Sequence, residues 1–139
     1  MRFMMFMIPG ELSDAEWAKG PSAENVGAMT RYNEELTKAG VLLALDGLHP
    51  ASAGARVTYS GGKPSVTDGP FAEAKELVGG YWIIQASSKE EAVEWAKRVP
   101  AGEHDIVEVR RIFELEDFSP EVQAVGHLSS TPPDQAVEH

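Results

Sequence analysis

The chain of 139 residues contains no cysteine. This absence excludes a disulfide scaffold, a thiolate nucleophile and a zinc site built from cysteines. The histidines do not compensate, because His104, His127 and His139 have no second ligand at a metal-binding spacing. We therefore expect no bound metal, and a chain without thiols fits a reducing compartment.

Long apolar runs are absent as well. Nowhere do about 18 apolar residues follow one another, so no transmembrane helix is predicted. The apolar run at the N-terminus ends at Pro9 and no small-residue cleavage site follows it, which argues against a secretory signal peptide. We interpret residues 2–8 as the first strand of a cytoplasmic protein.

Basic residues are scarce, since 12 Lys and Arg stand against 22 Asp and Glu, for a net charge of −10. Such a charge repels phosphate backbones and anionic membranes, so neither a nucleic acid nor a membrane is expected as a partner. The phosphate-binding patterns GxGxxG and GxxxxGK and the serine pattern GxSxG are also missing. We expect no bound cofactor and no serine-hydrolase mechanism.

The apolar patterning predicts one α+β domain over residues 1–118. Four main strands, two helices and a hairpin around Gly61-Gly62 are expected, the second helix opening with a capping box of Ser88 and Glu91. The strands are 2–8, 41–45, 80–86 and 105–113, the helices 22–39 and 89–99, and the hairpin arms 55–60 and 63–67. Residues 9–21 read as a loop, and residues 119–139 as a flexible or loosely docked tail.

The order β-α-β-hairpin-β-α-β is that of a ferredoxin-like fold with an extra hairpin. The central positions of its sheet should go to residues 2–8 and 80–86, which are apolar on both faces. Two helices cover only one face of such a sheet, so the apolar residues of the other face need a second partner. A second copy of the chain is the simplest one, which predicts a homodimer.

The most informative motif is Asp68-Gly69-Pro70-Phe71 at the end of the second hairpin arm. Glycine admits a positive φ and proline fixes its own φ, so this turn holds Asp68 on rigid, sharply directed backbone. An Ala-Glu-Ala-Lys-Glu run and Gly79-Gly80-Tyr81-Trp82 follow it. The motif resembles the signature of the DGPF branch of the YCII-related proteins. Matching segments over roughly residues 2–114 are Asn33–Leu36, Ala39–Val41, Gly47–Pro50, Glu90–Ala92, Trp95-Ala96 and Val107–Arg110.

This resemblance implies a dimeric α/β barrel, in which the sheets of two protomers enclose a shared interior. It also implies a His–Asp pair in a cleft, for which Asp68 carries over directly from the motif and His49 is the candidate histidine. DGPF-type domains occur beside extracytoplasmic-function sigma factors, so the resemblance further implies a sigma-factor-linked regulatory partner.

His49 and Asp68 are our candidates for catalysis. Each lies next to a proline at the exit of a strand, and antiparallel geometry can bring the two turns to the same end of the sheet. A carboxylate that fixes the tautomer of an imidazole makes a general acid–base device. The alternative is that Asp68 only caps its own turn and that His49 is a surface loop residue.

Four further residues are candidates for ligand binding. Arg110 shares a strand face with Glu108 and would either clamp a carboxylate or phenolate or form a salt bridge. Lys75 would pair with an anionic ligand at a pocket rim or lie on a solvated helical turn. Tyr81 and Trp82 would line a small-molecule pocket or belong to the core or the dimer interface.

Two functions remain open. The first is a cofactor-independent enzyme of the lyase or isomerase type, with Asp68 and His49 moving protons on a small aromatic or carbonyl compound; fold analogy supports it. The second is a non-catalytic ligand-binding or regulatory module, whose acidic surface suits a basic partner.

Overall fold

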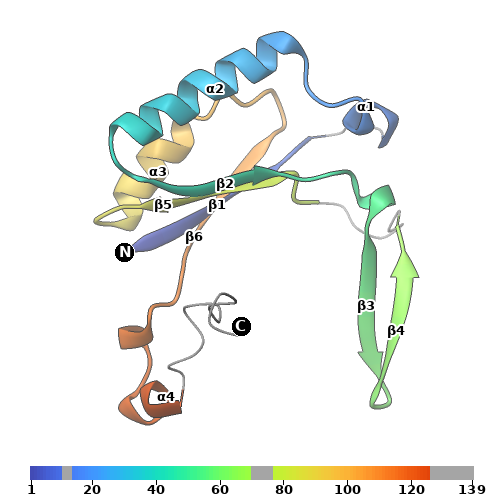
Figure 1. Ribbon diagram of the computed structural model, residues 1–139, viewed down its shortest axis with the longest axis vertical. Coiled ribbons are helices and arrows are strands. Elements are labelled where there is room, and N and C mark those ends of the chain that lie inside the picture. The colour runs from blue at the N-terminus through green and yellow to red at the C-terminus, as the bar shows by residue number, and fades with distance from the viewer. Residues whose placement is uncertain (11–13, 70–76, 126–139) are drawn as a thin grey trace, which may run out of the picture.

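The order of elements is that of a ferredoxin-like α+β fold (Figure 1). The computed structural model describes residues 1–10, 14–69 and 77–125. The elements are β1 (Arg2–Ile8), α1 (Asp14–Ala18), α2 (Ala23–Lys38), β2 (Leu42–Gly47), β3 (Ala55–Ser60), β4 (Lys63–Asp68), β5 (Gly80–Gln85), α3 (Lys89–Lys97), β6 (Ile106–Arg111) and α4 (Pro120–Val125). Four strands form an antiparallel sheet in the order β2-β5-β1-β6. The predicted fold class is confirmed.

The two central strands are those that the sequence places there, β1 and β5. Their register pairs Met5 with Trp82 and Phe6 with Tyr81, so alternate residues of both strands face the same side. On one side Phe3, Met5 and Ile84 are buried beneath the helices. The opposite side of β1 and β5 is apolar as well, with Met4, Phe6 and Ile83.

Helices α2 and α3 cover one face of the sheet, and no helix of the described residues covers the other face (Figure 1). Leu36 of α2 and Ala92 of α3 are fully buried against the sheet. We call the uncovered side the open face; it presents Met4, Phe6, Ile83, Glu108 and Arg110. Burial of one face only is what two helices can achieve on a four-stranded sheet.

The helix ends follow local sequence signals with one difference. Ser22 caps α2 and Ser88 caps α3, each hydroxyl accepting a hydrogen bond from a backbone N–H three residues on. The predicted capping box is only half formed, because the Glu91 carboxylate accepts from the backbone N–H of Ser87, at 2.9 Å, and from the Ser87 hydroxyl. These hydrogen bonds lower the pKa of Glu91.

Two segments differ from the sequence prediction. Residues 14–18 form the short helix α1 where a loop was expected, and Pro120–Val125 form α4 within the predicted tail. Both helices are very short, so neither carries the repeated apolar stripe from which a helix is predicted. Residues 126–139 lie outside the described part of the chain.

Tyr32 connects the two covering helices. Its hydroxyl donates a hydrogen bond to the backbone oxygen of Trp95 at 2.7 Å, and its ring meets Trp82 edge-on at 5.9 Å between centroids. Burial raises the pKa of Tyr32 to about 12, because the phenolate would lose its hydration.

We expect ionisation of the Tyr32 phenol to destabilise the folded protein at high pH. A pKa raised in the folded state means that the stabilisation is complete below the unfolded value of about 10 and is lost as the pH rises towards 12. Absorbance at 295 nm should show a late-ionising tyrosine that Tyr32→Phe removes, and urea unfolding of this variant should change less between pH 10 and 12. A single step near pH 10 that Tyr32→Phe leaves unaltered contradicts this expectation.

The β3–β4 hairpin stands apart from the main sheet as a separate two-stranded ribbon. Gly61 and Gly62 form its tip with φ of 60° and 78°, the left-handed conformations that the predicted two-residue turn requires. Figure 1 shows the hairpin and α4 projecting from opposite ends of the sheet, both on the side of the open face.

Candidate functional site

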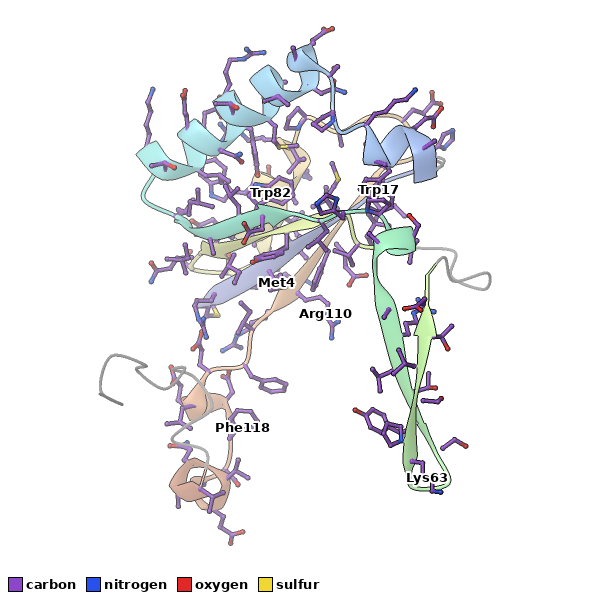
Figure 2. The ribbon with its side chains drawn as sticks, turned by 45° about the vertical axis from the view of Figure 1, so that its right-hand side comes forward. Met4, Trp17, Lys63, Trp82, Arg110 and Phe118 are labelled. Carbon is purple, nitrogen blue, oxygen red and sulfur yellow. The ribbon has the colours of Figure 1, made fainter. Side chains whose placement is uncertain are left out.

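A pocket of about 650 Å³ lies at one end of the sheet, on the side of the helices. Its walls come from α1, the first half of α2, the end of β2 with the turn after it, and the start of β5. Trp17 and Trp82 lie on this side of the sheet, whereas Met4 and Arg110 lie on the opposite one (Figure 2).

Gly79 joins three segments at the base of this pocket. Its N–H donates to the backbone oxygen of Met7 at 2.7 Å, and its oxygen accepts from the N–H of Leu48 at 2.9 Å. The indole N–H of Trp17 then donates to the oxygen of Leu48 at 3.1 Å. A Cβ at Gly79 would lie 2.8 Å from Cγ of Pro9, so only glycine allows this approach.

Trp82 and Asn33 form the inner wall. The indole Nε1–H of Trp82 donates to Oδ1 of Asn33 at 2.9 Å, which fixes the orientation of the amide. No group among the described residues accepts a hydrogen bond from this amide, so its two N–H donors are available to a ligand. Met29, Leu48 and Trp17 add apolar surface, and Asn25 is a second amide in the lining.

Tyr81 and Asp46 border the pocket from the end of the sheet, but the register places both side chains on the open face, together with Phe6. There the Tyr81 hydroxyl donates to Oδ2 of Asp46 at 2.8 Å, and this hydrogen bond to a carboxylate raises the pKa of Tyr81. Glu16 and His49 also line the pocket, and His49 is exposed to solvent there. Among the described residues that line the pocket there is no lysine or arginine.

Three of the six predicted site residues meet at this pocket, namely His49, Tyr81 and Trp82. Asp68 ends β4 and is exposed, outside the described lining. Within the described ranges no hydrogen bond or ion pair joins it to His49, and the proposed pairing stays a prediction.

The two predicted cationic anchors do not line the described pocket. Arg110 and Glu108 share the open face, as the alternation in β6 predicts, with Arg110 beside Met4 (Figure 2). Lys75 lies outside the described residues, together with Pro70 and Phe71 of the motif.

Gly69 of the Asp-Gly-Pro motif was expected to supply a positive φ, but the structure requires a glycine there for another reason. Gly69 does not have a left-handed φ. Its N–H donates to the oxygen of Gly54 at 3.0 Å, and a Cβ on it would lie 1.8 Å from the backbone oxygen of Ala51. Gly69 is therefore required by close packing of two backbones at the base of the hairpin.

Sequence reasoning missed Asn33, Trp17 and Asp46 as pocket residues. A weak signal existed for Asn33, a polar residue beside Tyr32 in the apolar stripe of a helix, and for Asp46, three residues before His49. Trp17 had no such signal, because the helix that carries it has only five residues.

Two kinds of feature are absent from the described residues. No group of three or more His, Asp or Glu side chains in the described ranges could hold a metal ion. No helix in the same part of the chain is long and apolar enough to cross a membrane.

Comparison with known proteins gives two matches. The profile of the YCII-related domain matches residues 1–116. A protein of Rhizobium meliloti (strain 1021), itself uncharacterized, is 29% identical over 97 residues, which are 70% of this chain and 78% of that protein.

Proposed function

The chain belongs to the YCII-related domain family, and from this premise we propose that it binds a small uncharged aromatic carbonyl compound in the pocket beside Trp82. The observation that carries the proposal is the Asn33 amide, held by Trp82 with its N–H donors free, in a largely apolar wall. A carbonyl oxygen is the acceptor that such donors select, and flat apolar walls suit an aromatic body.

Charge favours an uncharged ligand over an anion. Glu16 brings a carboxylate to the pocket, and the described lining offers no lysine or arginine to neutralise a ligand carboxylate. An anion that enters would lose its hydration without gaining a counter-charge. Arg110 could serve as an anchor only for a ligand on the open face.

The chemistry we propose is proton transfer by His49 next to the bound carbonyl, in a lyase or isomerase type of reaction. An imidazole suits this role because it accepts and returns a proton near neutral pH. We keep Asp68, on the hairpin, as its proposed carboxylate partner. The Asp68-Gly69 turn supports assignment to the DGPF branch.

Indole N–H resonances provide the first test. The chain has three tryptophans, of which Trp17 and Trp82 line the pocket and Trp95 does not. We expect a subset of a library of uncharged aromatic ketones, aldehydes and amides to shift the Trp17 and Trp82 signals while Trp95 stays unchanged. The carboxylate analogue of each ligand should bind at least about tenfold more weakly.

Asn33→Asp is the matched variant for this test. It keeps an oxygen that accepts from Trp82 but removes the N–H donors, so affinity for the carbonyl compounds should fall by about tenfold or more. The indole N–H of Trp82 should remain as protected as in the parent protein, because the carboxylate that Asn33→Asp introduces still accepts its hydrogen bond. Equal binding of ketones and carboxylates, or no shift confined to Trp17 and Trp82, would contradict the proposed ligand.

Turnover separates the two functional classes. If the ligands are converted, His49→Gln should abolish conversion and leave binding intact, and Asp68→Asn should slow it by roughly 10²-fold or more if the pair operates. If ligands bind without conversion in the parent protein, the non-catalytic module, with a sigma-factor-linked partner, becomes the better description.

We also propose that two protomers pair through their open faces in the cytoplasm. Met4, Phe6 and Ile83 lie on a sheet face that no described helix covers, and apolar residues of this kind need a cover. Arg110 and Glu108 on the same face supply both signs of charge, as a self-complementary interface requires. Sedimentation equilibrium should give twice the chain mass at micromolar concentration.

A further inference from the structure

The β3–β4 hairpin, which we call the arm, has one apolar and one polar face. Its register places Val57 opposite Val66 and Tyr59 opposite Pro64, and these pairs share one face because alternate residues of a strand point the same way. The other face carries Thr58 and Ser65, whose hydroxyls are 2.9 Å apart, with Arg56, Thr67, Ser60 and Lys63. The arm is thus patterned like a strand pair with a core on one side.

The described residues of the protomer do not supply that core. Tyr59 is 79% exposed, Val66 68% and Val57 49%. A two-stranded ribbon is at best marginally stable in water unless its apolar face is covered. The amphipathic pattern therefore indicates a partner that packs on the apolar face of the arm.

A second uncovered apolar surface lies at the other end of the sheet, on the C-terminal segment, residues 113–125. Phe113 is 70% exposed and stacks on Phe118 with 4.9 Å between ring centroids. Ion pairs hold the segment to the sheet, from Arg2 to Glu114 at 2.7 Å and from Arg111 to Asp117 at 2.8 Å. The stacked rings are therefore presented on a fixed support.

Charge matches the two surfaces. The arm carries Arg56 and Lys63 on its polar face and Asp68 at the base of its apolar face, two basic residues against one acidic residue in a chain whose net charge is −10. The C-terminal segment contains acidic residues and no Lys or Arg: Glu114, Glu116, Asp117 and Glu121. The excess of basic residues on the arm and of acidic residues on this segment favours contact between the two over contact between two arms, which would bring like charges together.

The two surfaces project from opposite ends of the sheet on the side of the open face, and both views show them well apart (Figures 1 and 2). Consider a second copy rotated by 180° about an axis that lies parallel to the sheet, on the side of the open face. The end of the sheet that carries the arm in one copy then meets the end that carries the C-terminal segment in the other. We propose that the arm of each protomer packs its apolar face on the C-terminal segment of a second copy of this chain. Two identical contacts then close the dimer.

The proposal rests on the homodimer proposed above, and spin labels test it separately from the dimer. Because the chain has no cysteine, Val66→Cys places a unique nitroxide on the apolar face of the arm and Ser65→Cys places a matched one on the polar face. In samples that sedimentation shows to be dimeric, we expect the label at position 66 to tumble at least about threefold more slowly than the label at position 65.

A second substitution identifies the surface that covers the arm. Phe113→Ser should restore fast tumbling at position 66, whereas Leu43→Ser, which removes an exposed apolar residue of β2, should leave it slow. A dimer in which position 66 is as mobile as position 65, or stays slow in Phe113→Ser, overturns the arm contact alone. Slow tumbling that persists in monomer at high dilution overturns it too, and a protein that never dimerises overturns both proposals.

Discussion

Ile84→Ala is expected to lower the free energy of unfolding by about 3–4 kcal/mol. Ile84 is fully buried in the central strand β5, between Phe3 of β1 and Leu42 of β2 and beneath the covering helices. Truncation leaves a cavity that neighbouring strands cannot fill, since their ladders fix the backbone on both sides. Urea unfolding followed by circular dichroism measures the loss.

Ile83→Ala is the matched control, one residue earlier on the same strand but on the open face. In dilute protein it should cost less than about 1.5 kcal/mol, because half-exposed atoms lose little on truncation. At high concentration its cost should grow, if the open faces pair. If Ile83→Ala and Ile84→Ala lowered the free energy of unfolding equally at all concentrations, the buried face and the open face of β5 would not differ as described.

Gly69→Ala has the second largest expected effect, a loss of about 3 kcal/mol. The added methyl group would meet the backbone oxygen of Ala51 at 1.8 Å, and a backbone atom cannot rotate away as a side chain can. The base of the hairpin must therefore shift, which breaks the hydrogen bond from Gly69 to Gly54. Thermal unfolding and hydrogen exchange of the hairpin amides provide the measurement.

Gly54→Ala provides the control, since its Cβ would lie 3.5 Å from the same oxygen of Ala51, an ordinary contact. We expect this variant to unfold within about 1 kcal/mol of the parent protein. Similar losses in both variants would show that glycine flexibility, and not the contact with Ala51, accounts for the requirement at position 69.

Much of the fold follows from short-range sequence signals. Runs that are apolar on both faces, residues 2–8 and 80–86, identify the two central strands, Gly61-Gly62 specifies the hairpin, and Ser22 and Ser88 begin the helices. The short helix α1 could not be found in this way. Five residues contain less than one repeat of an apolar stripe, and such a helix owes its stability to tertiary contacts.

The site was predicted less completely. Tyr81 and Trp82 were identified because aromatic residues commonly line small-molecule pockets, and His49 because it follows a strand at a turn next to a proline. Asn33 was missed, since its role depends on a hydrogen bond to Trp82, far along the chain. Arg110 was identified by residue type alone, and no property of β6 by itself tells which face of the sheet borders a pocket.

The sequence by itself determined the order of the elements and the two faces of each strand, because these depend on spacings of a few residues. Only the tertiary structure decided which of these residues meet. Gly79 against Pro9, Gly69 against Ala51 and the Asn33 amide against Trp82 each join segments that local spacing does not relate. Chain packing sets such distances to within an ångström. At that precision a Cβ at Gly69 or Gly79 would clash with a neighbouring segment, and the Asn33 amide is held in position for a ligand.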